Sequence, residues 1–187
     1  MINDPRLRKM KYESISEIYA ANEKVRAQLK GVLSKLTEEQ LTARPDGEKW
    51  NIQQIVEHIS IVDESTMKIC AKLLKRAKQG GRIGDGRVAI SEHFVQKGQE
   101  IARIKVDAPS FVQPTGERTV SDSIAKLDET SERLAEMQPL FESLDCVEAK
   151  FPHPFFGEIS GQEWLALKGG HEMRHIKQIE RLASKLK

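Results

Sequence analysis

Apolar residues recur every three or four positions along four long stretches of the chain. This spacing is typical of helices that bury one face. We therefore predict long helices over residues 14–36, 51–79, 121–144 and 160–186. Each of the first, second and fourth opens with a polar cap and a Glu or Gln three positions later, the pattern of a capping box. Four long helices in one chain predict an all-α fold, a four-helix bundle.

The segments between these helices carry weaker patterns. A further capping box, Thr37 with Gln40, predicts a short helical turn, and "SEHFVQKGQEIARI" predicts one short helix. The stretch "FPHPFFGEIS" is predicted to be a loop because it holds two prolines, and Pro139 is predicted to kink or end the third long helix. About 40 residues join the second and third long helices, enough for a long crossover between helices that run parallel.

Charge and composition narrow the function classes. The 30 basic and 28 acidic residues give a net charge of +2, which argues against nucleic acid as a partner. The basic run from Lys72 to Arg82 is interpreted as the solvated end of a helix. No apolar run approaches the roughly 20 residues of a membrane span, and "MINDPRLRKMKYES" lacks the apolar region of a signal peptide. With only Cys70 and Cys146, the chain does not resemble a disulfide scaffold, so we expect a cytoplasmic protein.

The C-terminal helix contains "HEMRH", which fits the zinc-protease pattern H-E-x-x-H. Such an enzyme needs a third protein ligand for its metal. The metzincin extension requires Gly and His where this chain has Gln178 and Arg181. Only 12 residues follow His175, and their one carboxylate, Glu180, lies five positions along the same helix and points to another side. The chain is therefore not expected to be a zinc protease.

The histidine pair itself remains a candidate metal site. His171 and His175 are four positions apart, so their side chains share one helical face, and two imidazoles so placed can bind one metal ion. A third ligand has to come from upstream. His58 is the first candidate because it borders the apolar stripe of the second long helix. His93 and His153, which lie in irregular segments, are the alternatives.

Two polar neighbours of the pair are assigned supporting roles. Gln178 lies three positions beyond His175 and is predicted to line the site or to hydrogen-bond a ligand histidine. Glu172 is rotated by about 100° from His171 around the helix, so we interpret it as solvated or as a second-shell partner. It is not expected to act as the base of a protease.

Two further features of the sequence concern packing. Gly169 and Gly170 each cost about 1 kcal/mol in a helix relative to alanine, which predicts either a close backbone approach beside the site or a kink. Trp50 and Trp164 are interpreted as core or loop anchors. The residues that select a substrate are expected in the 80–120 segment and around His153, because binding residues concentrate in loops.

Three stretches, taken in order, resemble the DinB family (the DinB/YfiT-like superfamily) between residues 14 and 186. They are "EKWNIQQIVEHIS", "HPFFGEISGQEWL" and "HEMRHIKQIERL". The resemblance implies a single helical domain over residues 1–187, with an up-down-down-up course. It also implies a divalent metal ion, zinc or nickel, held by three histidines. In this chain the matching positions are His58, His171 and His175.

The same resemblance bears on activity and assembly. DinB-like proteins are often homodimers, and characterised relatives include transferases and isomerases that use low-molecular-weight thiols, beside proposed metal-dependent hydrolases. We therefore expect a metal-binding protein that acts on a small molecule as a hydrolase or a thiol-dependent transferase. The alternative hypothesis is a non-catalytic, stress-related helical bundle with a structural metal or none. Neither nucleic acid nor a membrane is expected as a partner.

Overall fold

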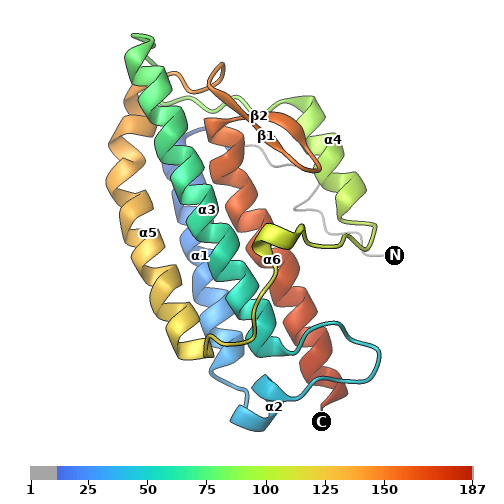
Figure 1. The fold of residues 1–187 in the computed structure, drawn as a ribbon. Helices are drawn as coiled ribbons and strands as arrows, with labels where there is room; N and C mark the ends of the chain where they lie inside the picture. Colours follow the sequence, from blue (N-terminus) through green and yellow to red (C-terminus); the bar gives the residue numbers. More distant parts are fainter. Residues whose placement is uncertain (1–11, 187) are drawn as a thin grey trace.

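The computed structural model describes residues 12–186 and is mostly helical (Figure 1). The first residues of the chain, to which the signal-peptide prediction refers, lie outside the described range. Within that range the helices are α1 (Ile15–Leu33), α2 (Glu38–Thr42), α3 (Ile52–Gln79), α4 (Glu92–Ile101), α5 (Val120–Ser143) and α6 (Gly161–Lys185), with a 3₁₀ turn, η1 (Ser110–Val112). The two strands are β1 (Lys150–His153) and β2 (Gly157–Ser160).

Most helix starts follow the predicted caps. Complete capping boxes open α2, α3 and α6, formed by Thr37 with Gln40, Asn51 with Gln54, and Ser160 with Glu163. At α1 the box is only half formed: Ser14 accepts the Glu17 N–H, while the Glu17 carboxylate bonds the backbone N–H of Glu13 at 2.7 Å. The helix starts were thus readable from short polar motifs.

Three local predictions differ from the structure. The α1 helix ends at Leu33, three residues early. Pro139 does not end α5, which continues to Ser143. The stretch predicted as a loop forms an antiparallel hairpin, in which Pro152 of β1 lies opposite Glu158 of β2. A proline is tolerated there because each strand of a two-stranded sheet is an edge strand.

The four long helices α1, α3, α5 and α6 pack side by side (Figure 1). The α3 helix contacts both α5 and α6, and α1 contacts mainly α6. Figure 1 shows α3 and α5 running in one direction and α1 and α6 in the other. Within the described range, every helix is too short or too polar to span a bilayer.

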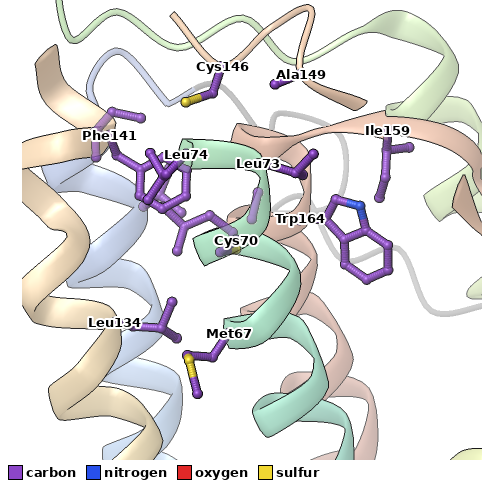
Figure 2. Close-up of a cluster of buried hydrophobic side chains, with 14 of the residues drawn as sticks. Met67, Cys70, Leu73, Leu74, Leu134, Phe141, Cys146, Ala149, Ile159 and Trp164 are labelled. Atoms are coloured by element: carbon purple, nitrogen blue, oxygen red, sulfur yellow. The ribbon is translucent and has the colours of Figure 1, made fainter. Parts of the chain in front are cut away.

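Two apolar clusters fill the interior between these helices. One lies at the hairpin end and is shown in Figure 2, where Met67, Phe141 and Trp164 come from three different helices. Cys70 and Cys146 are buried in this cluster as free thiols. The second cluster lies toward the opposite end, and its buried members include Leu29, Ile55, Leu127 and Ile179. All four long helices contribute to both clusters, and His58 lies on α3 while His171 and His175 lie on α6.

The close approach at the glycine pair is made by the side chain of Asn22 on α1, and not by a backbone beside the candidate metal site as predicted. A Cβ atom on Gly169 would collide with the carboxamide oxygen of Asn22, whose Nδ2 donates to the Leu165 carbonyl at 3.0 Å. Gly169 therefore serves helix packing on the α1 side. A Cβ atom on the exposed Gly170 would meet nothing within 4 Å, so packing does not require glycine there.

Candidate metal centre

Three imidazoles from two helices converge on one point. The Nε2 atom of His171 lies 3.2 Å from Nε2 of His58 and 3.1 Å from Nε2 of His175. One nitrogen from each of the three rings lies within 4.8 Å of the others. Nitrogens bound at 2.0–2.1 Å to one tetrahedral ion are about 3.3 Å apart. The measured separations therefore fit a shared cation.

Hydrogen bonds on the far side of two rings determine which nitrogen carries the proton. Nδ1 of His58 lies 2.7 Å from the Val112 carbonyl oxygen, and Nδ1 of His175 lies 2.9 Å from Oε1 of Gln178. Both oxygens only accept, so each Nδ1 donates and each Nε2 keeps a lone pair. His171 Nε2 can donate a proton to only one of these lone pairs. A bound cation would satisfy all three nitrogens, and the predicted contact of Gln178 with a ligand histidine is present.

Burial keeps these histidines neutral. His58 and His175 are 4% and 8% exposed, and His171 is partly buried. Burial is the main reason that the pKa of each ring is lowered. For His175 the pKa falls to about 3, with a smaller contribution from His58. For His171 the pKa lies well below its usual value, because the other two rings oppose its protonation as well. Neutral imidazole is the form that binds metals.

The two outer histidines are better supported than the central one. Trp50 packs against His58 with the ring centroids 5.0 Å apart, so this tryptophan contacts the site and is more than a core anchor. By contrast, Nδ1 of His171 is buried and has no hydrogen-bond partner among residues 12–186. With Nε2 as the ligand atom, that N–H would stay unsatisfied, so His171 relies on packing for its orientation.

A neighbour of His58 fixes the segment that supplies the Val112 carbonyl. The buried carboxylate of Glu57 accepts three hydrogen bonds of 2.8–3.0 Å, from the backbone N–H groups of Thr115 and Gly116 and from the Thr115 hydroxyl. Sequence reasoning missed both Glu57 and the Val112 carbonyl. Glu57 could have been noticed because it is an acidic residue directly beside a candidate ligand. A backbone carbonyl leaves no such signal in the sequence.

The other two candidate ligands lie outside this group. His93 is exposed, and its Nε2 donates to the Phe156 carbonyl at 2.9 Å. His153 is partly buried in the hairpin, with its ring centroid 5.1 Å from that of Trp164. Of the three upstream histidines that were considered, the structure brings His58 to the α6 pair.

The glutamate of "HEMRH" is not solvated, contrary to the prediction. Glu172 is 0% exposed, and its carboxylate receives Arg26 Nε at 2.7 Å and Arg26 Nη2 at 3.0 Å. The rotation away from His171 directs this side chain into the packed interior rather than into water. Among the described residues it makes no hydrogen bond with any of the three histidines.

Glu172 belongs to a buried ion cluster with Arg26, Asp63 and Lys168. Arg26 Nη2 lies 2.6 Å from Asp63 Oδ2, and Lys168 Nζ lies 3.0 Å from the same oxygen. Arg26 Nη1 also donates to the Leu127 carbonyl on α5 at 2.8 Å. The cluster therefore links all four long helices. A cleft of about 390 Å³ between α1 and α5 reaches Arg26 and Lys168, and none of the three histidines lines it.

Comparison with known proteins assigns the chain to a family. The family model described as "DinB superfamily" matches residues 21–179. The chain is also similar to the uncharacterized protein YuaE of Bacillus subtilis (strain 168), with 27% identity over 158 residues that cover 82% of this chain and 90% of YuaE. No solved structure matches the chain. Because the family model covers most of the sequence, the chain belongs to the DinB superfamily.

Proposed function

We propose that this protein binds one divalent metal ion through His58, His171 and His175, and that the resulting centre is catalytic. The observation that supports the proposal is the convergence of the three Nε2 atoms, two of them held as lone-pair donors by the Val112 carbonyl and Gln178. Imidazole ligands suit zinc and nickel, the two ions that we favour.

The charge of the site favours an anionic ligand. Three neutral imidazoles leave the double charge of the ion uncompensated, and among residues 12–186 the ligand group includes no carboxylate. When bound, such an ion lowers the pKa of a water molecule or a thiol at its open position. In a zinc protease the glutamate of the H-E-x-x-H motif is the general base that activates water. Here the carboxylate of that glutamate, Glu172, is bound by Arg26 and is not available for this role. We therefore favour transfer of a low-molecular-weight thiol to a small electrophile over hydrolysis.

The long crossover between α3 and α5 would complete the site. It supplies the Val112 carbonyl to His58, and its middle is fastened to α6 by Arg174, which donates to the carbonyls of Ile101 at 2.8 Å and Ile104 at 3.0 Å. These contacts lie one position from His175, on the helix that carries two of the ligands. We propose that this crossover and the hairpin select the substrate.

The resemblance also supports a proposal for the whole molecule. We propose a four-helix bundle with an up-down-down-up course, forming a single domain over residues 1–187 and acting as a cytoplasmic homodimer. The helix directions in Figure 1 agree with that course.

Metal analysis of protein purified without an affinity tag tests the metal centre. We expect about one zinc or nickel ion per chain, as for a mononuclear three-histidine site. A double variant, His58→Ala with His171→Ala, should lose the ion, while His93→Ala should keep it. Equal metal content in the double variant and the wild type would disprove the site.

An activity screen of metal-loaded protein, run with and without low-molecular-weight thiols, tests the reaction. Turnover that depends on a thiol supports the transferase, and thiol-independent cleavage of esters or amides supports the hydrolase. A fully loaded protein without turnover in either arm would favour the non-catalytic bundle instead.

A further inference from the structure

His153 presents a fixed hydrogen-bond donor that the three-histidine site does not use. Its Nδ1 accepts the backbone N–H groups of Phe155 at 3.1 Å and Phe156 at 3.3 Å. The proton of the neutral ring must therefore be on Nε2. Among residues 12–186, no side chain or backbone group forms a hydrogen bond with that Nε2. A partly buried donor without a partner is available to a ligand.

The ring is held in place by aromatic neighbours. Its centroid lies 5.1 Å from that of Trp164 and 5.0 Å from that of Phe156. Trp164 is itself fixed, because it is buried at the edge of the apolar cluster in Figure 2 and its Nε1 donates to the Phe151 carbonyl at 3.2 Å. Burial lowers the pKa of His153 to about 4, so the ring is a neutral donor at neutral pH.

Trp164, the residue against which His153 packs, is on α6, the helix that also carries His171 and His175. Trp164, Leu167 and His171 follow one another at three and four positions, so they line one face of the helix. Trp164 and His171 are seven residues apart, a rise of about 10 Å. His153 packs against Trp164 at one end of this span, and His171 lies at the other end. A molecule of several bonds could reach from one to the other.

We propose that His153 is a substrate-binding residue whose Nε2–H donates to a carboxylate at one end of an elongated substrate, while the other end reaches the three-histidine centre. A carboxylate is favoured because the Nε2–H group can only donate, and a charged acceptor forms the strongest hydrogen bond with such a donor. The exposed Phe155 beside His153 suits an apolar chain between the two ends. The proposal rests on the metal centre proposed above.

Cobalt-substituted protein and α,ω-mercaptocarboxylic acids of increasing chain length provide the test. The thiolate binds the cobalt ion and gives a charge-transfer band, and the carboxylate reports on His153. In the wild type, affinity should rise with chain length to a maximum and then fall. His153→Asn should weaken the best acid about tenfold or more, the usual effect of losing a hydrogen bond to a charged group. Aminothiols of matching length, whose ammonium groups cannot accept a hydrogen bond, should bind both proteins equally.

The variant is chosen to preserve the hairpin. The Asn side-chain oxygen can replace Nδ1 as acceptor for the turn N–H groups, as Asn does in turns. His153→Gln keeps an N–H near the position of Nε2 and should restore part of the affinity.

Equal affinity of wild type and His153→Asn for the best acid, or no length optimum in the wild type, would overturn the role of His153. Failure of the wild type to bind cobalt, seen before any thiol is added, would instead overturn the metal centre.

Discussion

The histidine cluster and the buried ion cluster share α3 and α6 but differ in how their charges and lone pairs are satisfied. In the buried ion cluster, two cations face two carboxylates, and Arg26 alone makes bonds to α3, α5 and α6. In the histidine cluster the groups are neutral, and the Nε2 atoms of His58 and His175 lie 3.2 and 3.1 Å from that of His171. In the first cluster opposite charges pair within the protein, and only Asp63 Oδ1 has no hydrogen-bond partner among residues 12–186. The second cluster offers lone pairs that suit the metal ion proposed above.

The comparison also explains the pentapeptide "HEMRH". Its two histidines belong to one cluster and its glutamate to the other, because adjacent residues on a helix point about 100° apart. A local motif can therefore match a catalytic pattern while its residues serve separate parts of the fold.

Removal of the central cation of the ion cluster should give the largest effect. Arg26→Met leaves two buried carboxylates with only Lys168 as a partner, which we expect to cost about 3–5 kcal/mol of unfolding free energy. Lys30→Met is the matched control, because Lys30 forms an exposed pair with Asp128 at 2.7 Å and should cost less than about 1 kcal/mol. Urea denaturation measures both.

The metal content of the folded Arg26→Met protein tests whether the ion cluster and the histidine cluster depend on each other. If the clusters are independent, the variant keeps its ion. Parallel loss of stability and metal would show that the two clusters form one unit.

A moderate effect is expected when one orienting group is removed from the histidine cluster. Gln178→Leu deletes the acceptor for His175 Nδ1–H, and we expect metal affinity to fall about tenfold to a hundredfold. The stability of the metal-free protein should change little. Competition with a metal chelator measures the affinity, and the exposed Glu180→Gln on the same helix is the control. Unchanged affinity would mean that Gln178 does not orient its neighbour.

The smallest effect concerns an ion pair at the surface. Arg181 and Lys185 hold the pKa of Glu48 at about 2, below its usual 4.5. A lowered carboxyl pKa stabilises the fold above pH 4.5, and that stabilisation is lost as the pH falls toward 2. Because both cations are about half exposed, Glu48→Gln should cost less than about 1 kcal/mol at pH 7.

The cost of Glu48→Gln should shrink at pH 3, as denaturant midpoints at the two pH values would show. A cost that is the same at both pH values would mean that the carboxylate charge is not the cause.

Much of the fold was predictable because it depends on local patterns. Apolar periodicity located the four long helices, and polar caps located most of their starts. The hairpin was missed because Pro152 disfavours a strand unless the strand lies at an edge, and edge position is a property of the fold. The histidine pair was predictable from its spacing, and His58 from its place beside an apolar stripe.

The ion cluster left a signal that was not used. Asp63 lies between Ile59 and Met67 on the inward face of α3, and Arg26 lies between Asn22 and Leu29 on that of α1. When charged residues of opposite sign lie on the apolar faces of several helices, they are expected to pair with one another in the interior. The contact between the Val112 carbonyl and His58 could not be predicted from any sequence pattern, because the direction of a backbone carbonyl depends on how the crossover is folded.

The anchoring of that crossover has a consequence for how such proteins can diversify. Its far end is fastened to α3 by Glu57, which adjoins His58, and its middle is fastened to α6 by Arg174. The stretch between the two anchors carries exposed apolar side chains, including Phe111 at 73% exposure. That stretch can be exchanged or lengthened while both fastenings remain. The fold therefore keeps the three-histidine group on α3 and α6 apart from this exposed stretch of the crossover, which makes the stretch a practical starting point for grafting new binding specificities.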